Sequence, residues 1–247
     1  MDFLIFQLQG PLASWGGAAV GEYRGSDDYP SQSALIGLLA AALGILRSDE
    51  AQLLALQDGY RFGIGLQSAG QLLRDYHTAQ VPPQAALKGW PRYSRRDELA
   101  IPKHQLETIL STRDYRQDAS VLVAVQALAA APWRLDELAQ ALAKPRFVLY
   151  LGRKACPPGV PLFAQVLSAD TLLAAFEQYR AVLHQRQQAD PAGGGSAALT
   201  RLIWSEPITP GCANSLTVKR KDRLIARQGW QFGDREEHVA LLQNGAS

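Results

Sequence analysis

The chain has 247 residues, 47% of them hydrophobic, and a formal net charge of +2. This length is enough for one large domain, or for one domain with a smaller partner, and gives ample capacity to form a core. The small net charge excludes an argument for nucleic-acid binding from charge alone, so the distribution of charges along the chain must decide that question. The two cysteines have no CxxC spacing and therefore indicate neither a zinc site nor a disulfide framework.

The first residues predict a strand and then a glycine-rich turn. Asp2 follows the initial methionine directly, and the apolar run 3–8 has the length of a strand, so we expect no signal peptide and a cytoplasmic protein. Gly10-Pro-Leu-Ala-Ser-Trp-Gly-Gly predicts a turn that contains Ser14 and Trp15. In one interpretation, Trp15 fills the core beneath the turn. In the other, the glycines let a ligand approach the backbone and the indole offers a stacking face.

Residues 30–44 predict a helix that is buried nearly all round, because almost every position is apolar. Ser31 can cap its first turn, and Gly44 can close its last turn in the left-handed conformation. The helix is too short to span a bilayer, which needs about 20 apolar residues. Gly37 suggests that another backbone passes close by. The helix start, with Ser31 and Ser33, is suited either to capping or to binding an anion, and the sequence leaves both interpretations open.

Two extended segments follow. Residues 60–66 predict a strand, and residues 72–78 form a further extended segment that carries Arg74, Tyr76 and His77. Gly63 and Gly65 do not continue into the third glycine and the helix of a dinucleotide-binding loop, so that motif is excluded.

Residues 81–116 differ in character from the rest. They hold four prolines, few aliphatic residues, and seven basic against four acidic side chains. A long excursion of this kind inside a compact domain is usually functional or disordered. It is either a solvated loop or a basic arm that becomes ordered against a polyanion. Trp90, Tyr93 and Tyr115, which lie between the charges, favour the arm.

The next elements complete a regular pattern. Residues 119–128 predict a strand, residues 135–142 a helix, and residues 147–151 another strand. The order of strand, helix, strand, strand, helix and strand is the βαββαβ plan of a ferredoxin-like domain, with the charged excursion between its central strands. This fold hosts many functions, so the plan alone does not decide what the protein does.

The last part of the chain has weaker patterning. It contains a second basic cluster at 219–227, where five basic residues accompany Asp222. This cluster fits a strand edge protected by lysine and arginine about as well as a patch that contacts phosphates. We predict an α+β chain with a ferredoxin-like domain over 1–154, its insertion at about 81–116, and a smaller, mostly β region over 155–247. The elements predicted beyond residue 163 are a strand at 164–167, a helix at 172–187, a flexible linker at 190–196, and strands at 199–204, 215–218 and 238–242.

Five motifs in the right order resemble a known family. They are Gly-Pro-Leu-Ala-Ser-Trp-Gly, the helical Pro-Ser-Gln-Ser-Ala-Leu-Ile-Gly, Leu-Arg-Asp-Tyr-His-Thr, Ser-Thr-Arg-Asp-Tyr-Arg-Gln-Asp-Ala, and Leu-Tyr-Leu-Gly-Arg-Lys-Ala-Cys-Pro. Together they resemble the Cas-five-type subunits of the type I-E Cascade, the CRISPR RNA-guided surveillance complex. The resemblance covers residues 3–163, and beyond that point the assignment rests on continuity.

The resemblance implies a repeat-associated (RAMP-type) RNA-binding fold with a protruding thumb, here the excursion at 81–116. It implies a subunit that holds the repeat-derived 5′ handle of the CRISPR RNA and contacts a CasC-type backbone subunit and a CasA-type large subunit. Contact with target DNA would be indirect. We expect no cofactor, no metal and no membrane association. The predicted RNA-binding residues are the positions that match the family's motifs and two arginines of the excursion: Ser14, Trp15, Ser31, Ser33, Arg74, Tyr76, His77, Arg95, Arg96, Thr108, Ser111, Arg113, Tyr115, Arg153 and Lys154.

These residue types suit a single-stranded RNA, because arginines bind phosphates, hydroxyls bind sugars and aromatic rings stack under bases. Catalysis has weaker support, since no nucleophile elbow, Walker loop or metal-binding helix is present. His77 and His104 have the chemistry of general bases for RNA cleavage. Lys103-His104 also resembles a pair that relatives of the I-C subtype use to cut RNA. The resemblance to type I-E implies that a separate subunit cuts, so we predict a non-catalytic RNA binder, with a metal-independent endoribonuclease as the alternative.

Overall fold

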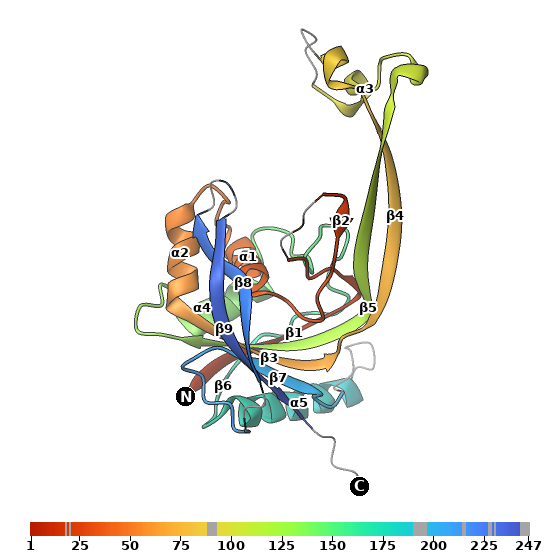
Figure 1. Cartoon of the computed structure of the whole chain (residues 1–247). Coiled ribbons are helices and arrows are strands. Elements are labelled where there is room, and N and C mark those ends of the chain that lie inside the picture. Colours follow the sequence, from red (N-terminus) through yellow and green to blue (C-terminus); the bar gives the residue numbers. More distant parts are fainter. Residues whose placement is uncertain are drawn as a thin grey trace.

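The computed structural model describes residues 1–17, 19, 21–87, 93–189, 197–213, 216–226, 229 and 231–242. One large, mainly antiparallel sheet with few helices dominates these residues, so the predicted mixture of helix and sheet is confirmed (Figure 1). The strands lie in the order β6-β1-β5-β3-β7-β9-β8, and β2 and β4 also pair with β5. Their bounds are β1 Asp2–Ala13, β2 Tyr23–Arg24, β3 Tyr60–Ser68, β4 Gln71–Val81, β5 Glu107–Ala127, β6 Gln165–Ser168, β7 Arg201–Trp204, β8 Leu216–Ala226 and β9 Gln231–Leu241. The linker predicted at 190–196 and the aromatic residue Trp90 lie outside the described residues.

Strands β6, β1, β5 and β3 form the antiparallel centre of the sheet. Helices α1 (Gln32–Leu43) and α2 (Glu50–Gly59) connect β1 to β3, and α4 (Leu135–Ala143) lies between β5 and β6. The strand predicted at 147–151 is wrong, because these residues are irregular and β6 takes the place beside β1. The backbone amides of Arg146 and Phe147 instead donate to carbonyls at the end of α1, at 3.0 and 3.1 Å.

Helix α1 has the caps that its sequence predicts. The hydroxyl of Ser31 accepts a hydrogen bond from the amide of Ala34 at 3.2 Å, and Gly44 closes the helix with a φ of 80°. The inference from Gly37 is wrong. A Cβ at that position would meet no atom within 4 Å, and Gly37 is exposed, so no other backbone approaches it.

The two faces of the sheet have separate cores, because neighbouring residues of a strand point to opposite faces. On one face, Phe6 and its alternating neighbours pack with α1, α2 and α4. On the other face, Ile5 packs with α5 (Leu172–Ala189), which is close to the helix predicted there. Gly63 of β3 permits this contact, since a Cβ there would lie 2.6 Å from the side chain of Leu172.

A long hairpin projects from the body of the protein (Figure 1). Strand β4 pairs with the first half of β5 without a register shift, from Gln71↔Gln117 to Val81↔Glu107. We call the described residues 71–87 and 93–117 the projecting hairpin. Its tip contains the short helices η1 (Gln84–Leu87), α3 (Arg95–Glu98) and η2 (Lys103–Gln105). The excursion predicted at 81–116 is therefore a regular strand from Glu107 onward, and the hairpin that carries it begins ten residues earlier, at Gln71.

The C-terminal strands continue the same sheet. Strand β7 pairs with β3, and the β8–β9 hairpin extends the sheet beyond β7 and then lies over α1 and α2. The buried side chain of Gln57 in α2 exchanges two hydrogen bonds with the backbone of Leu224 in β8, at 2.9 and 2.6 Å. The sheet thus runs without a break across the boundary predicted between residues 154 and 155. Within the described residues, no helix is long and apolar enough to cross a membrane.

Candidate nucleic-acid interface

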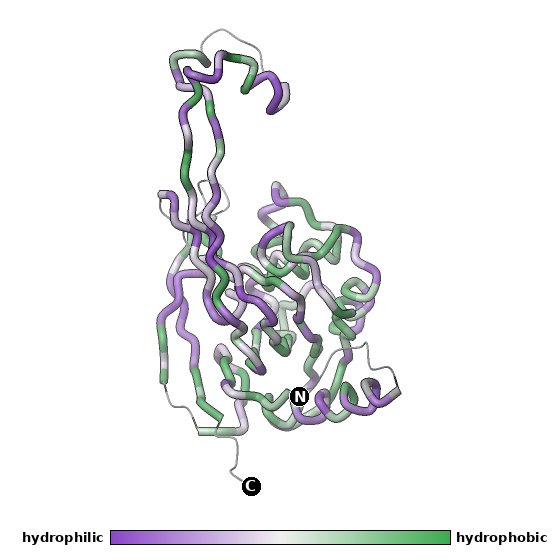
Figure 2. Tube along the Cα trace, turned by 90° about the vertical axis from the view of Figure 1, so that its right-hand side faces the viewer, coloured by the Kyte–Doolittle hydropathy of each residue, from purple (hydrophilic) through white to green (hydrophobic). Residues whose placement is uncertain are grey.

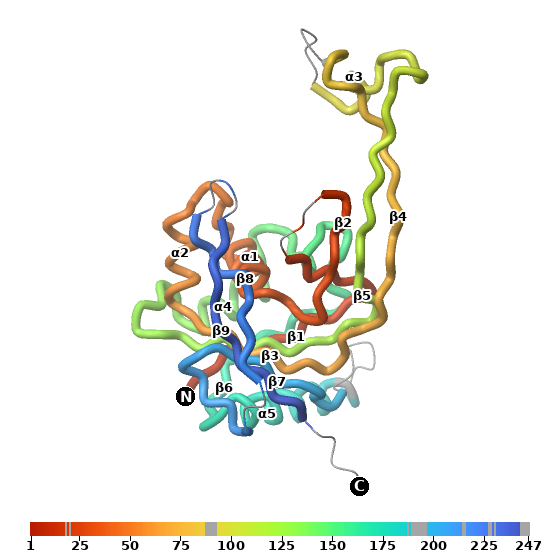
Figure 3. Tube along the Cα trace, viewed as in Figure 1, coloured from red at the N-terminus to blue at the C-terminus, as the bar shows by residue number. Residues whose placement is uncertain are grey.

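Side chains from several segments meet at Asp114, where the projecting hairpin leaves the body. The Asp114 carboxylate is buried, and it accepts hydrogen bonds from the Tyr23 hydroxyl at 2.5 Å and from Nε of Arg74 at 2.9 Å. The hydroxyl of Ser14 donates to the Asp114 carbonyl at 3.1 Å. Tyr23 reaches this position because β2 pairs alongside β5, as the tube view shows (Figure 3). Two predicted residues, Ser14 and Arg74, are therefore brought together.

The charges of this cluster compensate one another. The Arg74 guanidinium beside Asp114 holds the pKa of that carboxyl below its ordinary value, with a further contribution from the Tyr23 hydroxyl, although burial opposes the shift. The hydrogen bond to the same carboxylate raises the pKa of Tyr23. Arg74 keeps 56% of its side chain exposed. It can therefore face a ligand while Asp114 fixes its orientation.

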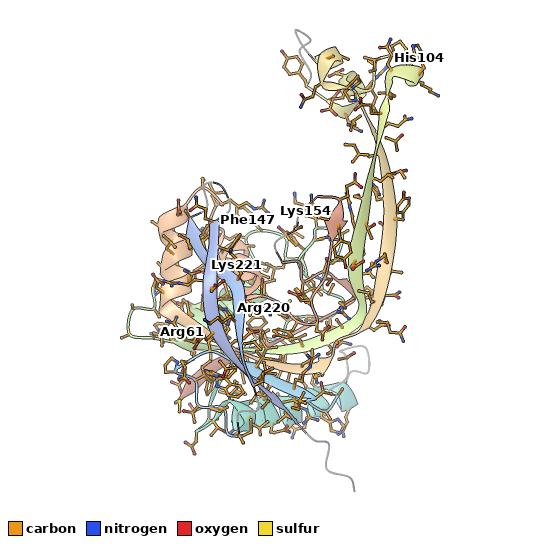
Figure 4. The ribbon with its side chains drawn as sticks, viewed as in Figure 1. Arg61, His104, Phe147, Lys154, Arg220 and Lys221 are labelled. Atoms are coloured by element: carbon orange, nitrogen blue, oxygen red, sulfur yellow. The ribbon has the colours of Figure 1, made fainter. Side chains whose placement is uncertain are left out.

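Arg153 joins the same cluster from the segment after α4. Its guanidinium donates to the carbonyls of Asp114 and Arg24, at 3.3 and 3.1 Å, and lies 4.8 Å from the centre of the Tyr115 ring. The turn before it, at Gly152, has a φ of 87°, and a Cβ there would lie 1.8 Å from the carbonyl of Ser14. Only glycine fits this close approach, which joins the first and last predicted motifs. Lys154 follows and is exposed (Figure 4). Ser14 follows β1, which runs on to Ala13, so the turn predicted from Gly10 is wrong for residues 10–13.

Three predicted residues have buried side chains with structural partners. Trp15 is 3% exposed and belongs to the core, as the first interpretation of the turn has it, so its indole presents no stacking face to solvent. Ser14 is 2% exposed. Ser31 is 5% exposed and caps α1, and its hydroxyl lies 3.0 Å from that of Ser33.

The start of α1 is already occupied by an anion of the chain itself. The carboxylate of Asp222 in β8 accepts a hydrogen bond from the first helical amide, of Gln32, at 2.7 Å. Asp222 is also paired with Arg235 of β9 at 2.6 Å. An RNA phosphate would have to displace this buried carboxylate, so the geometry favours capping over anion binding at Ser31 and Ser33.

The projecting hairpin separates its predicted residues onto two faces, because directly opposite residues of a ladder point to the same side. Arg74, Tyr76 and Thr108 share one face. The other face has His77 opposite Ser111, and it also carries Arg113 and Tyr115. No single face of the hairpin therefore presents all of these predicted residues.

The tip carries the remaining predicted residues of the hairpin. Arg95 and Arg96 are exposed, and Arg95 pairs with Glu98 at 2.6 Å and donates to the carbonyl of Gln80. Lys103 and His104 lie in η2 at the far end of the hairpin, where both are exposed (Figure 4). The described residues provide His104 with no hydrogen-bonding partner. Nor do they contain a group of three His, Cys, Asp or Glu residues that could hold a metal ion.

The second basic cluster divides along β8, because alternate residues face opposite sides. Lys219, Lys221 and Arg223 are exposed. Arg220 points inward, pairs with Asp27 at 2.7 Å and lies 4.5 Å from the centre of the Tyr29 ring. Arg227 lies outside the described residues. The exposed cations follow the last strand of the sheet, as expected for a protected edge.

Sequence reasoning missed the role of three residues at the hairpin root. Tyr23 and Arg24 form a strand of only two residues, which gives no periodic signal. Asp114 lies inside one of the family motifs, where the sequence shows it only as one of the acidic residues of the excursion. Its place between the predicted RNA-binding residues Arg113 and Tyr115 is the signal in the sequence that points to it.

The sheet order and the projecting hairpin define a mixed α/β protein built on one large, mainly antiparallel sheet. The model of the family described as CRISPR-associated protein (Cas_Cas5) matches residues 3–236, and the chain belongs to this family. The CRISPR system Cascade subunit CasD of Escherichia coli (strain K12) is 31% identical over 246 residues, which cover 96% of this chain and 95% of that protein.

Solved structures agree with this assignment. A chain of a CRISPR RNA-guided surveillance complex has a TM-score of 0.62 and 25% identity, and the match covers 97% of this chain and 89% of that one. A crystal structure of a Cas protein has a TM-score of 0.57 and 24% identity, with coverage of 96% and 94%, and supports the fold alone.

Proposed function

We propose that this protein is a non-catalytic RNA-binding subunit of a Cascade-type CRISPR surveillance complex, acting in the cytoplasm in antiviral defence. Its family, and its similarity to CasD and to a chain of a CRISPR RNA-guided surveillance complex, support this role. The bound RNA would be the repeat-derived 5′ handle of the CRISPR RNA. The protein partners would be a CasC-type backbone subunit and a CasA-type large subunit, with target DNA contacted indirectly.

We further infer that the centre of the sheet is a ferredoxin-like RAMP core and that the projecting hairpin is its thumb. The antiparallel order β6-β1-β5-β3, with helices between β1 and β3 and between β5 and β6, supports the first inference. The second rests on the shape of the hairpin, which stands clear of the body (Figures 1 and 2).

The observation that carries the RNA-binding proposal is the cluster at the hairpin root. Asp114 holds Arg74, and the Asp114 carbonyl and the Tyr115 ring hold Arg153, which exposed Lys154 follows in the chain. Oriented guanidinium groups bind phosphates well, and side chains already fixed lose little conformational entropy on binding. The Ser14 hydroxyl fixes the backbone of Asp114, and Tyr76 continues the face of Arg74 along the hairpin, whereas Arg113 lies on the opposite face.

Arg95 and Arg96 would meet RNA or a neighbouring subunit at the tip. The nuclease alternative has less support, because Lys103 and His104 lie at the far end of the hairpin, away from the root cluster (Figure 4).

Lys154→Ala is the sharpest test, because none of the described residues pairs with the Lys154 side chain, so its loss should not disturb the fold. We expect the purified variant to fold normally and to bind the handle RNA more weakly than the wild type. A lost phosphate contact should reduce the slope of log K against log salt by about 0.7. Lys144→Ala, which removes an exposed lysine at the end of α4, is the matched control. Equal affinities and slopes for both variants and the wild type would contradict the proposed surface.

A further inference from the structure

The projecting hairpin has two edges, and they are covered differently. On the side of β5, β2 pairs in parallel at Tyr23↔Thr112 and Arg24↔Arg113. On the opposite side, β4 forms the outer edge, and among the described residues it pairs with β5 alone. The 11 residues of β4 therefore leave one row of backbone amides and carbonyls without a strand partner.

This edge has few of the features that protect an edge strand from pairing. Natural proteins use lysine and other charged side chains, proline, bulges or a covering element for that purpose, and β4 has only the adjacent, opposite charges of Arg74 and Asp75. Strand β4 contains no lysine and no proline, and its ladder with β5 has no register shift. The terminal strand β8 is the contrast within the same chain. It has register shifts, exposed Lys219 and Lys221, and the Gln57 side chain bonded to its backbone.

Three side chains of β4 offer exposed apolar surface that a polypeptide can cover. Leu72, Leu73 and Tyr76 are 51%, 38% and 64% exposed, although they lie on a strand. The charges of Arg74 and Asp75 cancel, and Arg74 is held by Asp114 across the ladder. Figure 2 shows hydrophobic residues recurring along the hairpin, where it stands apart from the body.

We propose that the outer edge of β4 docks an extended segment of a partner polypeptide, which joins the projecting hairpin as an additional strand. Alternate residues of β4 direct an amide and a carbonyl outward, and another β-strand supplies acceptors and donors at the matching spacing. Arg95 already covers the Gln80 carbonyl at the distal end, so the docking site is residues 71–79. The docking site uses the backbone edge of β4, whereas the RNA surface uses the side chains of Arg74 and Arg153 at the hairpin root.

Hydrogen exchange at single-residue resolution tests the proposal on the full chain. In the free protein, we expect the β4 amides that face β5 to exchange slowly and the alternate amides to exchange fast. In the ribonucleoprotein assembly, purified through a tag on this chain and treated with ribonuclease, the fast amides of 71–79 should slow by roughly threefold to tenfold or more. Fast exchange that persists in the assembly would overturn the proposal. Slowing in the free chain that rises with protein concentration would show a second copy on the edge, and would also overturn it.

A pair of proline variants supplies the matched control. In neighbouring residues one amide faces β5 and the other faces outward, so Thr78→Pro and Ala79→Pro remove one of each. The variant that lacks the outward amide should keep normal protection of the β5 amides at 107–111 but lose the added protection of β4 in the assembly. The variant that lacks the amide facing β5 should lose protection in both strands. If the variant with an intact ladder still acquires full protection at 71–77 in the assembly, no strand docks there.

Discussion

The strongest prediction concerns Asp222, a carboxylate buried between the C-terminal hairpin and α1. It is 5% exposed and accepts hydrogen bonds from the amide of Gln32 at 2.7 Å and from Nε and Nη2 of Arg235 at 2.6 and 2.9 Å. Asp222→Ala leaves the helix amide and the guanidinium without this partner. The substitution therefore tests whether the contact between β8 and α1 is a main source of stability.

The structure sets the expected magnitude. Removing one partner of a buried ion pair costs about 3–5 kcal/mol, because the other charge stays buried and uncompensated. Arg235 retains Glu237 at 2.7 Å and the Ser205 hydroxyl at 3.0 Å, so we expect a loss near the lower limit, about 3 kcal/mol. In a chain of this size, 1 kcal/mol lowers Tm by about 2–4 °C, which gives an expected decrease of about 6–12 °C.

Thermal unfolding followed by circular dichroism measures this decrease. The control is Asp136→Ala, which removes a carboxylate that pairs with exposed Arg134 at 2.9 Å. An exposed pair contributes about 0–1 kcal/mol, so the control should lower Tm by no more than about 4 °C. If Asp222→Ala lowers Tm no further than the control, the buried cluster does not stabilise the fold as argued.

Three further predictions follow from the same structure. Trp15→Ala should destabilise the protein by about 3–5 kcal/mol with or without RNA, because the indole lies in the core, and an unchanged melting curve would contradict its burial. Because Arg74 lowers the pKa of Asp114, the ionised carboxylate stabilises the fold above about pH 4, and this contribution is lost as the pH falls through the lowered pKa. Asp114→Asn should therefore flatten the dependence of Tm on pH below about pH 4, and a slope equal to that of the wild type would refute this reasoning. His104→Ala should leave mature CRISPR RNA levels unchanged in cells that keep a dedicated processing subunit, whereas lost processing would support the nuclease alternative.

Elements whose signals are local were predicted from the sequence. The start and end of α1 follow from Ser31 and Gly44, because a cap acts within one turn of its helix. Strand β1 follows from the apolar run at residues 3–8. The motifs carried the resemblance to the family, which the match over 3–236 confirms.

The tertiary structure alone decided which distant groups became partners. Residues 147–151 have the composition of a strand, but the amides of Arg146 and Phe147 bond to the end of α1. The strand that pairs with β1 on this side is therefore β6, at 165–168. The sequence shows Asp222 as one acid in a basic run, and only the fold places it at the start of α1.

The same holds for the hairpin root. Ser14, Arg74 and Arg153 belong to separate motifs, and the fold brings all three to Asp114. Local propensity depends on neighbours a few residues away. A buried carboxylate instead takes the partners that the packed sheet places within hydrogen-bonding distance, and those partners lie far away in the chain.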